Sequence, residues 1–194
     1  PMTPALDHFG LLAPFYERFI QPKFPERLVE LAGLTPTARV LDCGGGTGRV
    51  AQFLCQRAGL VALADQSLKM LAEARKKACL HPAGADAERL PFPADSFDAV
   101  LMVDALHHVN NQAETAAELW RVLRPGGRIV IEEPDIHTFG VKLIALAEKL
   151  LLMRSHFLSD AQITALFEAH PAARCAVRAE AGTVWVVVEK ATFS

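Results

Sequence analysis

The chain has 194 residues, of which 51% are hydrophobic, and a net charge of −2, so it can bury a sizeable core in a single domain. This charge balance creates no global field that would attract nucleic acid or an anionic membrane surface. No apolar run is long enough to cross a bilayer and no signal peptide is recognisable, so we expect a cytoplasmic protein with no membrane span.

The four cysteines are Cys43, Cys55, Cys79 and Cys175. They show neither metal-ligand spacing nor a CxxC motif, so free thiols in a reducing cytosol are the simplest interpretation. A metal site built from His107, His108 and His137 lacks the usual ligand spacing, and we expect no metal.

The first 36 residues are punctuated by prolines, which favour the first turn of short helices. Pro14 and Pro25 each suit such a start, and Gly33 suits the end of the second helix. A segment of this kind does not readily add a strand to a parallel sheet. We therefore expect residues 1–36 to form a helical cap at one end of a sheet.

Residues 40–54 predict a strand, a glycine-rich turn and an amphipathic helix in immediate succession. Between Asp42 and Gly48 the sequence follows the pattern D-x-G-x-G-x-G. Glycines allow positive φ and a close approach to a ligand, and the helix N-terminus offers free N–H groups. A dinucleotide fingerprint would need a small residue where Arg49 stands, and the lysine of a phosphate-binding loop is missing, so a pyrophosphate site is disfavoured.

This pattern resembles motif I of the class I S-adenosylmethionine (SAM)-dependent methyltransferases, although on its residues alone it would also suit a tight βα turn in any α/β protein. The resemblance implies that the loop runs beneath SAM, with Thr47 near the methionine moiety. It also implies that Asp42 orients the loop or meets the methionine amine. The cofactor-binding residues predicted from this stretch are Asp42, Gly44, Gly46, Thr47 and Gly48.

Residues 60–65 predict a second strand that ends in Asp65, and Ser67 can cap the helix that follows. Asp65 lies about 20 residues after Gly46, the interval at which an acidic residue reaches a ribose in nucleotide-binding βαβ units. A carboxylate can accept hydrogen bonds from both ribose hydroxyls. We predict that Asp65 and the neighbouring Gln66 contact the cofactor, with a helix-capping role for Asp65 as the alternative.

A weak third strand around 81–85 leads into residues 86–92, which resemble the adenine-contacting motif of the same family. The resemblance implies that the Asp86 side chain takes the exocyclic amine and that the Ala87 N–H meets a ring nitrogen. Without the family, this stretch would indicate only a turn before a proline-punctuated loop.

The apolar run that starts at Phe97 predicts a strand buried on both faces, and open α/β sheets bind ligands where such strands end. Val103 and Asp104 stand at this end and are predicted to face the cofactor. His107 and His108 follow directly and are candidate general bases, because a histidine titrates near neutrality. Paired histidines in a loop can equally be solvated or capping groups, and Glu133 and His137 are secondary candidates.

The stretch 118–127 also resembles the family, and it predicts a helix that ends at Arg124-Pro125-Gly126-Gly127, followed by a strand over 128–134. Residues 139–153 predict a helix with a broad apolar face. That face would suit a buried core helix, a lid over an apolar substrate pocket, or a homodimer contact. Ser159 and Gln162 predict a capping box, and Ala181-Gly182 predicts the turn of a terminal hairpin.

The expected fold class is therefore α/β. We predict a Rossmann-like three-layer α/β/α sandwich with a seven-stranded, mostly parallel sheet and a C-terminal antiparallel hairpin. One domain would cover residues 1–194, with a cap at 1–36, a cofactor-binding core at 38–134, and a helical lid and terminal hairpin at 135–194.

The resemblance implies methyl transfer from SAM, with S-adenosylhomocysteine as product, to a small-molecule acceptor. Its pattern is similar to the ubiquinone/menaquinone-biosynthesis branch, whose acceptors are aromatic or lipid-like. A non-catalytic SAM-binding scaffold remains an alternative, and a nicotinamide-dependent oxidoreductase is a weaker one. Methylation of nucleic acid is disfavoured, because the chain is slightly acidic and lacks the Asn/Asp-Pro-Pro-aromatic and Pro-Cys motifs of DNA enzymes.

Overall fold

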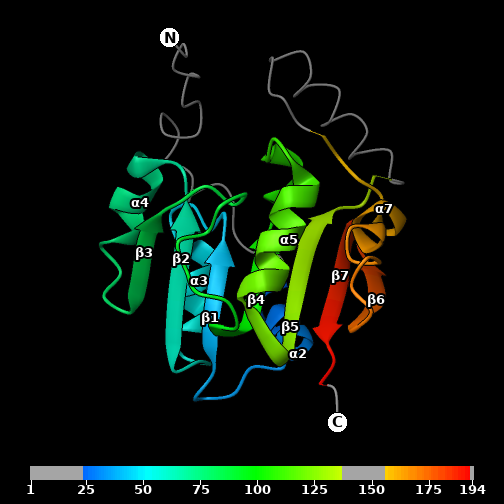
Figure 1. The fold of residues 1–194 in the computed structure, drawn as a ribbon. Coiled ribbons are helices and arrows are strands. Elements are labelled where there is room, and N and C mark those ends of the chain that lie inside the picture. The colour runs from blue at the N-terminus through cyan, green and yellow to red at the C-terminus, as the bar shows by residue number, and fades with distance from the viewer. Residues whose placement is uncertain (1–23, 137–155, 193–194) are drawn as a thin grey trace.

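The computed structural model describes residues 24–136 and 156–192, which form one seven-stranded sheet with helices on both faces (Figure 1). The strands are β1 (Arg39–Cys43), β2 (Leu60–Asp65), β3 (Leu80–Gly84), β4 (Phe97–Val103), β5 (Leu123–Pro134), β6 (Ala173–Glu180) and β7 (Thr183–Lys190). The helices are α2 (Pro25–Ala32), α3 (Arg49–Leu54), α4 (Leu68–Ala74), the 3₁₀ turn η1 (Leu106–His108), α5 (Gln112–Val122) and α7 (Asp160–Ala165).

The order of the strands across the sheet is β3-β2-β1-β4-β5-β7-β6, and β1 to β5 are parallel. β7 runs antiparallel to β5, and β6 runs antiparallel to β7. This arrangement confirms the predicted parallel sheet with a terminal antiparallel hairpin. The order reverses between β1 and β4, and the loops that follow these two strands meet at such a switch point.

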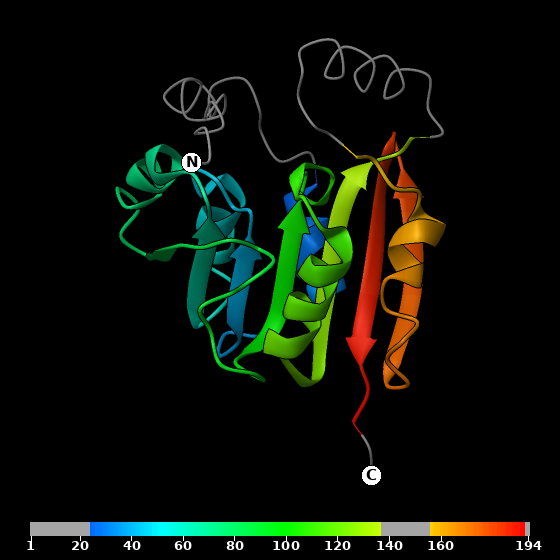
Figure 2. The same ribbon diagram turned by 45° about the horizontal axis from the view of Figure 1, so that its top comes forward.

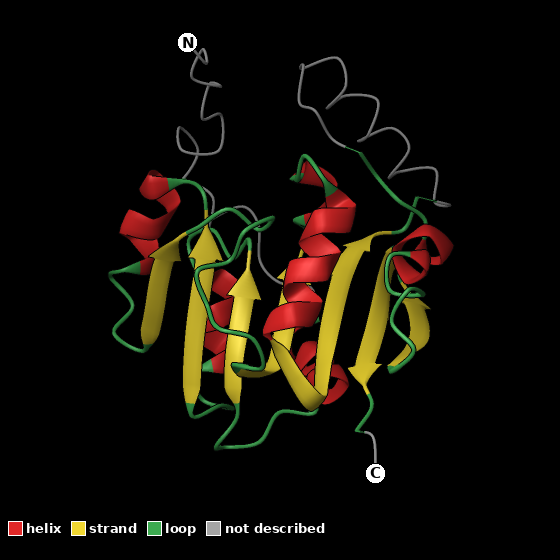
Figure 3. Cartoon of the chain, in the orientation of Figure 1, coloured by secondary structure: helices red, strands yellow, loops and turns green. Residues whose placement is uncertain are grey.

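Helices cover both faces of the sheet, as Figures 2 and 3 show from two directions, and an apolar cluster lies between each helical layer and the sheet. On one face the sheet packs against α5 and α7 through Leu119, Ile163 and Phe167. On the other face Leu28 and Leu54 bring α2 and α3 onto the sheet. The central strands are buried on both faces, which explains why their sequences are continuous apolar runs. The expected three-layer architecture is therefore confirmed.

Local signals in the sequence place several element ends correctly. Pro25 opens α2, and Gly33 ends it in the left-handed conformation at φ 61°. Ser159 and Gln162 form the predicted capping box of α7. Ala181 and Gly182 form the hairpin turn with φ values of 47° and 78°. The predicted helices at 14–20 and 139–153 and the candidate His137 lie outside the described residues.

The predicted helix stop at Arg124-Pro125-Gly126-Gly127 is wrong, because this stretch belongs to β5. The helix ends already at Val122, and Leu123 pairs with Phe97 at the start of β4. Gly127 runs so close to β4 that a Cβ atom there would lie 2.7 Å from the Asp98 carbonyl oxygen. The residues between Leu123 and Arg128 have no partner in the register with β4, and Gly126 has φ 80°, so the turn signal appears as an irregularity within β5.

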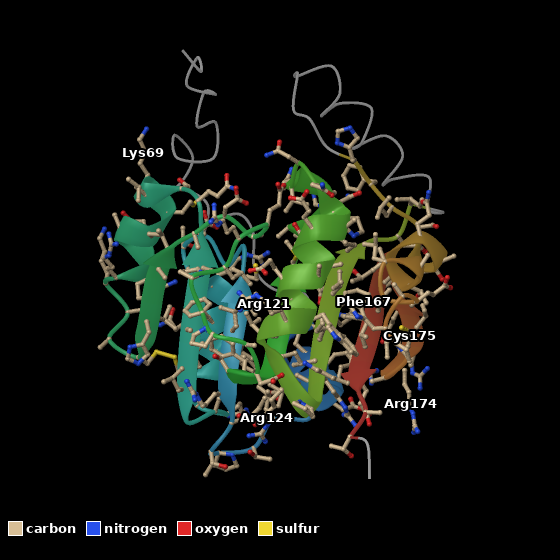
Figure 4. The ribbon with its side chains drawn as sticks, in the orientation of Figure 1. Lys69, Arg121, Arg124, Phe167, Arg174 and Cys175 are labelled. Atoms are coloured by element: carbon tan, nitrogen blue, oxygen red, sulfur yellow. A yellow bond between two sulfur atoms is a disulfide. The ribbon has the colours of Figure 1, made fainter. Side chains whose placement is uncertain are left out.

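The expectation of four free thiols is also wrong, because Cys55 and Cys79 form a disulfide (Figure 4). Cys55 caps the C-terminus of α3, and Cys79 immediately precedes β3, with 6.1 Å between their Cα atoms. Cys43 is a buried free thiol and Cys175 an exposed one. Disulfides persist in oxidising compartments and are rare in the cytosol, so this bond argues against the cytoplasmic location. The location itself stays a prediction. In residues 24–136 and 156–192, no helix has the length and apolar character needed to span a membrane.

We predict that replacing both Cys55 and Cys79 by serine lowers the free energy of unfolding by about 3 kcal/mol, because the bond closes a loop of 24 residues. Urea unfolding of oxidised protein, with and without a reducing agent, measures this change. The Cys175→Ser variant is the matched control and should unfold like the wild type. An unfolding midpoint that ignores the reducing agent would contradict the prediction.

Candidate functional site

The glycine-rich turn runs from the end of β1 to the start of α3 and is held against the end of β2. Gly44, Gly46 and Gly48 have φ values of 74°, 56° and 80°, a region that favours glycine. The N–H of Gly44 donates to the Ala64 carbonyl at 2.7 Å. A Cβ atom at Gly48 would lie 2.5 Å from Leu80 Cδ1, so this position also requires glycine for space.

Asp65 connects the end of β2 to this turn through its carboxylate. Oδ2 accepts the N–H of Gly46 at 2.8 Å, and Oδ1 accepts the N–H of Ser67 at 2.8 Å. Among the described residues, a Cβ atom at Gly46 would meet only Asp65 Oδ2 and Met70 Sδ, each at 4.0 Å. The space in front of Gly46 is thus open beside a carboxylate, where a hydroxylated ligand could approach.

Asp42 lies beneath the turn and is 1% exposed. Its Oδ2 has no hydrogen-bond partner within the described part of the chain. Burial raises the pKa of Asp42 to about 7, although the positive charge of Arg49 opposes the shift. A Cβ atom at Gly45 would lie 2.7 Å from Asp42 Oδ2, so the backbone covers this carboxyl tightly.

Two cationic side chains brace the turn, and the sequence analysis missed both roles. Lys77 Nζ donates to the Thr47 carbonyl at 2.9 Å, and the Thr47 side chain is buried. Arg49 Nη2 lies 3.1 Å from Asp104 Oδ2, which joins the start of α3 to the exit of β4. The first contact joins residues that are 30 positions apart in the sequence and the second joins residues that are 55 positions apart, so no local sequence pattern predicts them.

The exit of β4 lies directly against the turn. A Cβ atom at Gly44 would come within 2.7 Å of Ala105 Cβ. Asp104 adopts φ 51°, and its N–H donates to the Glu132 carbonyl at 2.9 Å. Val103 is buried within β4, whereas the Asp104 side chain is 38% exposed. Of these two predicted cofactor contacts, Asp104 is the one that reaches solvent.

His107 and Glu133 form a buried pair at the carboxyl ends of β4 and β5. His107 Nδ1 hydrogen-bonds Glu133 Oε2, and both side chains are at most 5% exposed. Glu133 Oε1 accepts the Leu106 N–H at 2.8 Å. Phe157 stacks on the His107 ring with 4.3 Å between centroids. The imidazole is therefore fixed in orientation by a carboxylate and an aromatic ring.

His108 differs sharply from its neighbour. Burial, and then the adjacent His107, lowers the pKa of His108 to about 3. Its imidazole is therefore neutral throughout the physiological range and is a poor proton acceptor. The two predicted catalytic histidines therefore differ in their surroundings, and a catalytic role for either one stays a prediction.

The stretch around Asp86 lies beside Asp65, because the Ala85 N–H donates to the Asp65 carbonyl at 3.0 Å. Asp86 is exposed, and its Oδ1 accepts the Glu88 N–H at 3.0 Å. Ala87 is half-buried and Gln66 is exposed. Leu68 is a large apolar residue that is 68% exposed, and it sits beside Gly84.

These features occupy one edge of the sheet, at the carboxyl ends of β1, β2, β4 and β5. The edge carries an open glycine turn, three carboxylates that are exposed or half-buried, and one buried histidine–glutamate pair. Such a set can bind a ribose and a base through acceptors, and it can move a proton. In residues 24–136 and 156–192 no group of three or more histidine, cysteine or acidic side chains is placed to hold a metal ion.

Comparison with known families shows that residues 41–131 match the family described as "Methyltransferase domain". The ubiquinone/menaquinone biosynthesis C-methyltransferase UbiE of Hahella chejuensis is 37% identical over 115 residues, which covers 54% of this chain and 46% of that protein. The chain thus spans about half the length of the curated relatives it matches.

Among solved structures, a Methanococcus maripaludis protein titled as a putative SAM-dependent methyltransferase superposes with a TM-score of 0.77 at 15% identity, covering 100% of this chain and 99% of its own. A putative methyltransferase from Haloferax volcanii, solved in complex with the Trm112 methyltransferase activator, gives 0.77 at 19% identity over 97% and 100%. These likenesses establish the fold.

The raised pKa of Asp42 predicts a pH-dependent cost to stability. The folded state holds the proton more tightly than the unfolded state, so the stability from this group is present at low pH and is lost as pH rises from 3.8 to about 7. The advantage of an Asp42→Asn variant over wild type should therefore grow across this range, by no more than about 4 kcal/mol. Urea unfolding at a series of pH values measures it.

The control is Glu168→Gln, which neutralises an exposed carboxyl. Its stability is measured over the same pH series. A difference between Asp42→Asn and wild type that stays constant with pH would contradict the prediction.

Proposed function

We propose that this chain is a class I SAM-dependent methyltransferase and that it transfers a methyl group from SAM to a small aromatic or lipid-like acceptor. The observation that carries the proposal is the open glycine turn beside the Asp65 carboxylate at the carboxyl edge of the sheet. SAM is the cofactor of this family, and S-adenosylhomocysteine is its product.

The residues around the turn fit SAM. Gly46 leaves room where a Cβ atom would otherwise stand, and Asp65 offers carboxylate oxygens at the same place. In the proposal, Gly44, Gly46 and Gly48 bring the backbone under the cofactor, and Asp65 with Gln66 holds the ribose. Asp42 and Thr47 support the turn from below, since both are buried beneath it.

The adenine would lie on the side of the turn toward β3. Asp86 is exposed there, and Ala87 supplies a backbone N–H in the next position. Leu68 offers an exposed apolar surface near Gly84, and a planar base gains from such contact. Leu68 thus joins Asp86 and Ala87 as a proposed adenine contact.

The acceptor would approach from the exit of β4, next to Asp104 and His107. When bound, SAM supplies a methyl group that is already activated by its positive sulfonium, so orientation and exclusion of water account for most of the catalysis. An acceptor that keeps its proton at the working pH also needs a base. We assign this role to His107, with Glu133 as a positioning residue, because Glu133 hydrogen-bonds Nδ1 of the imidazole.

An aromatic acceptor is supported by the curated relatives, whose printed name is ubiquinone/menaquinone biosynthesis C-methyltransferase. Methylation at a ring carbon or hydroxyl releases a proton, which is the step that a histidine base serves. Because the chain spans only part of the length of those relatives, we propose a class of acceptor for it and not a particular quinone.

The cofactor assignment predicts that Asp65→Ala weakens SAM binding by roughly tenfold to a hundredfold, because hydrogen bonds to a charged carboxylate are lost. Asp65→Asn should lose less, since an amide oxygen can still accept the Gly46 N–H. Calorimetric titration with SAM, S-adenosylhomocysteine and NADH gives these affinities directly.

Glu168→Ala, which removes an exposed carboxylate after α7, should bind SAM like the wild type. Preferred binding of NADH, or SAM affinity that is indifferent to Asp65, would sink the proposal. SAM binding without turnover of any aromatic acceptor would favour the non-catalytic scaffold instead.

The base assignment predicts that Glu133→Gln lowers kcat by about 100-fold or more on an acceptor that must lose a proton. The affinity for SAM should stay unchanged, and the pH profile of kcat should change shape because the group that orients His107 has lost its charge. His108→Gln is the matched neighbour and should leave the pH profile in place. A pH profile that moves with His108 and not with Glu133 would reverse the assignment.

A further inference from the structure

Within residues 24–136 and 156–192, β6 is the outermost strand of the sheet and pairs with β7 alone (Figures 1 and 2). An exposed strand edge of this kind presents a row of backbone N–H and C=O groups that can pair with another chain. The opposite edge, β3, is five residues long and contains Pro82, which has no N–H to donate. β6 is eight residues long, contains no proline and is therefore the edge that can accept a further strand.

The hairpin fixes which backbone groups of β6 point outward. Its two-residue turn places Glu180 opposite Thr183, and the Ala191 N–H bonds the Ala172 carbonyl at 2.9 Å. In an antiparallel ladder the bonded positions alternate, so the even-numbered residues of β6 bond to β7. The N–H and C=O groups of Cys175, Val177 and Ala179 consequently face the open side.

The side chains of this edge are small or charged. Cys175, Ala176 and Ala179 are exposed and short, so a second strand could approach the backbone without a clash. Arg174 and Cys175 lie on this outer strand, as labelled in Figure 4. Edge strands that are protected from pairing commonly carry proline, a bulge or charged side chains. β6 has no proline and no bulge along its ladder with β7, and its charged side chains are of both signs, so they can face opposite charges on a second copy.

The charges specify one register. If two copies pair antiparallel about a two-fold axis at Val177, Arg174 of each copy stands opposite Glu180 of the other. Both residues lie on the same face of the strand, because their numbers differ by an even count. A shift of the axis to position 176 would set Arg174 against Arg178, and a shift to position 178 would set Arg178 against itself. An axis at position 179 would also set Arg178 against Glu180, but it would pair only residues 178–180 of each strand. Among the axes that pair five or more residues of β6, the axis at Val177 is the one that makes opposite-charge pairs without facing arginines.

We propose that two copies of this chain associate through β6 to form one continuous antiparallel sheet across a two-fold axis at Val177. The outward backbone groups of residues 175, 177 and 179 would form about six hydrogen bonds across the axis. Glu180 Oε2 already lies 3.3 Å from Arg27 Nη2, and both groups are solvent-exposed, so this contact offers little resistance to a second arginine.

Charge exchange tests the register. Sedimentation equilibrium should show a dimer for the wild type, whereas Arg174→Glu and Glu180→Arg should each weaken dimerisation about tenfold or more, through two facing like charges. The double variant, Arg174→Glu with Glu180→Arg, should restore dimerisation to near the wild-type constant. A wild type that stays monomeric at all accessible concentrations, or a dimer that ignores all three variants, would overturn the proposal.

Blocking the backbone edge gives an independent test. Cys175→Pro removes an outward N–H while the bonds from β6 to β7 remain, so it should abolish the dimer. Cys175→Ser is the matched control and should leave the dimer intact. Dimerisation that survives Cys175→Pro would overturn the proposal and would indicate a contact through another surface, such as the helix predicted at 139–153.

A cross-link tests the pairing directly. In the proposed register Cys175 stands opposite position 179 of the second copy, so Ala179→Cys should yield a disulfide-linked dimer under mild oxidation. Within one copy these two positions lie about 13 Å apart along the strand and cannot be bridged. Ala176→Cys, one of the even-numbered positions, should cross-link far less. Equal cross-linking of the two variants would overturn the register.

Discussion

The bond between the Asp65 carboxylate and the Gly46 N–H is the contact on which the proposed site depends. It joins the end of β2 to the turn after β1, and the same carboxylate also holds the Ser67 N–H at the start of α4. One side chain thereby connects the turn after β1, the end of β2 and the start of α4. A carboxylate suits this task because its two oxygens can accept several N–H groups at once.

The buried carboxyl group beneath this turn lowers the stability of the folded state. Asp42 is buried with one oxygen unpaired among the described residues, and its pKa is raised to about 7. Arg49 acts in the opposite direction and also reaches Asp104 at the exit of β4. A network of charges that leaves one member uncompensated is typical of a functional site rather than of a core built for stability alone. The turn is therefore positioned by electrostatics as well as by its glycines.

Sequence patterns predict the helices, strands and turns better than the contacts between them. Apolar runs, the glycine turn, the capping box at Ser159 and the hairpin turn at Ala181 are local signals, and each appears where it was predicted. The pairing of Leu123 with Phe97, the Cys55–Cys79 bond and the Lys77 contact to Thr47 join distant positions. Such contacts arise only when the sheet brings β2, β3 and β4 together, so no window of the sequence contains them.

The terminal hairpin connects the outer edge of the sheet to the candidate site. β7 lies against β5 so that Val184 pairs with Glu133, and Trp185 Nε1 donates to the Glu132 carboxylate at 2.6 Å. The Asp135 N–H donates to the Gly182 carbonyl at 2.9 Å, which ties the hairpin turn to the end of β5. The strand that carries Glu133 is thus held from both sides, by β4 and by β7. A second copy paired along β6 would restrain the hairpin further, while the carboxyl edge that carries the glycine turn would stay open to ligands.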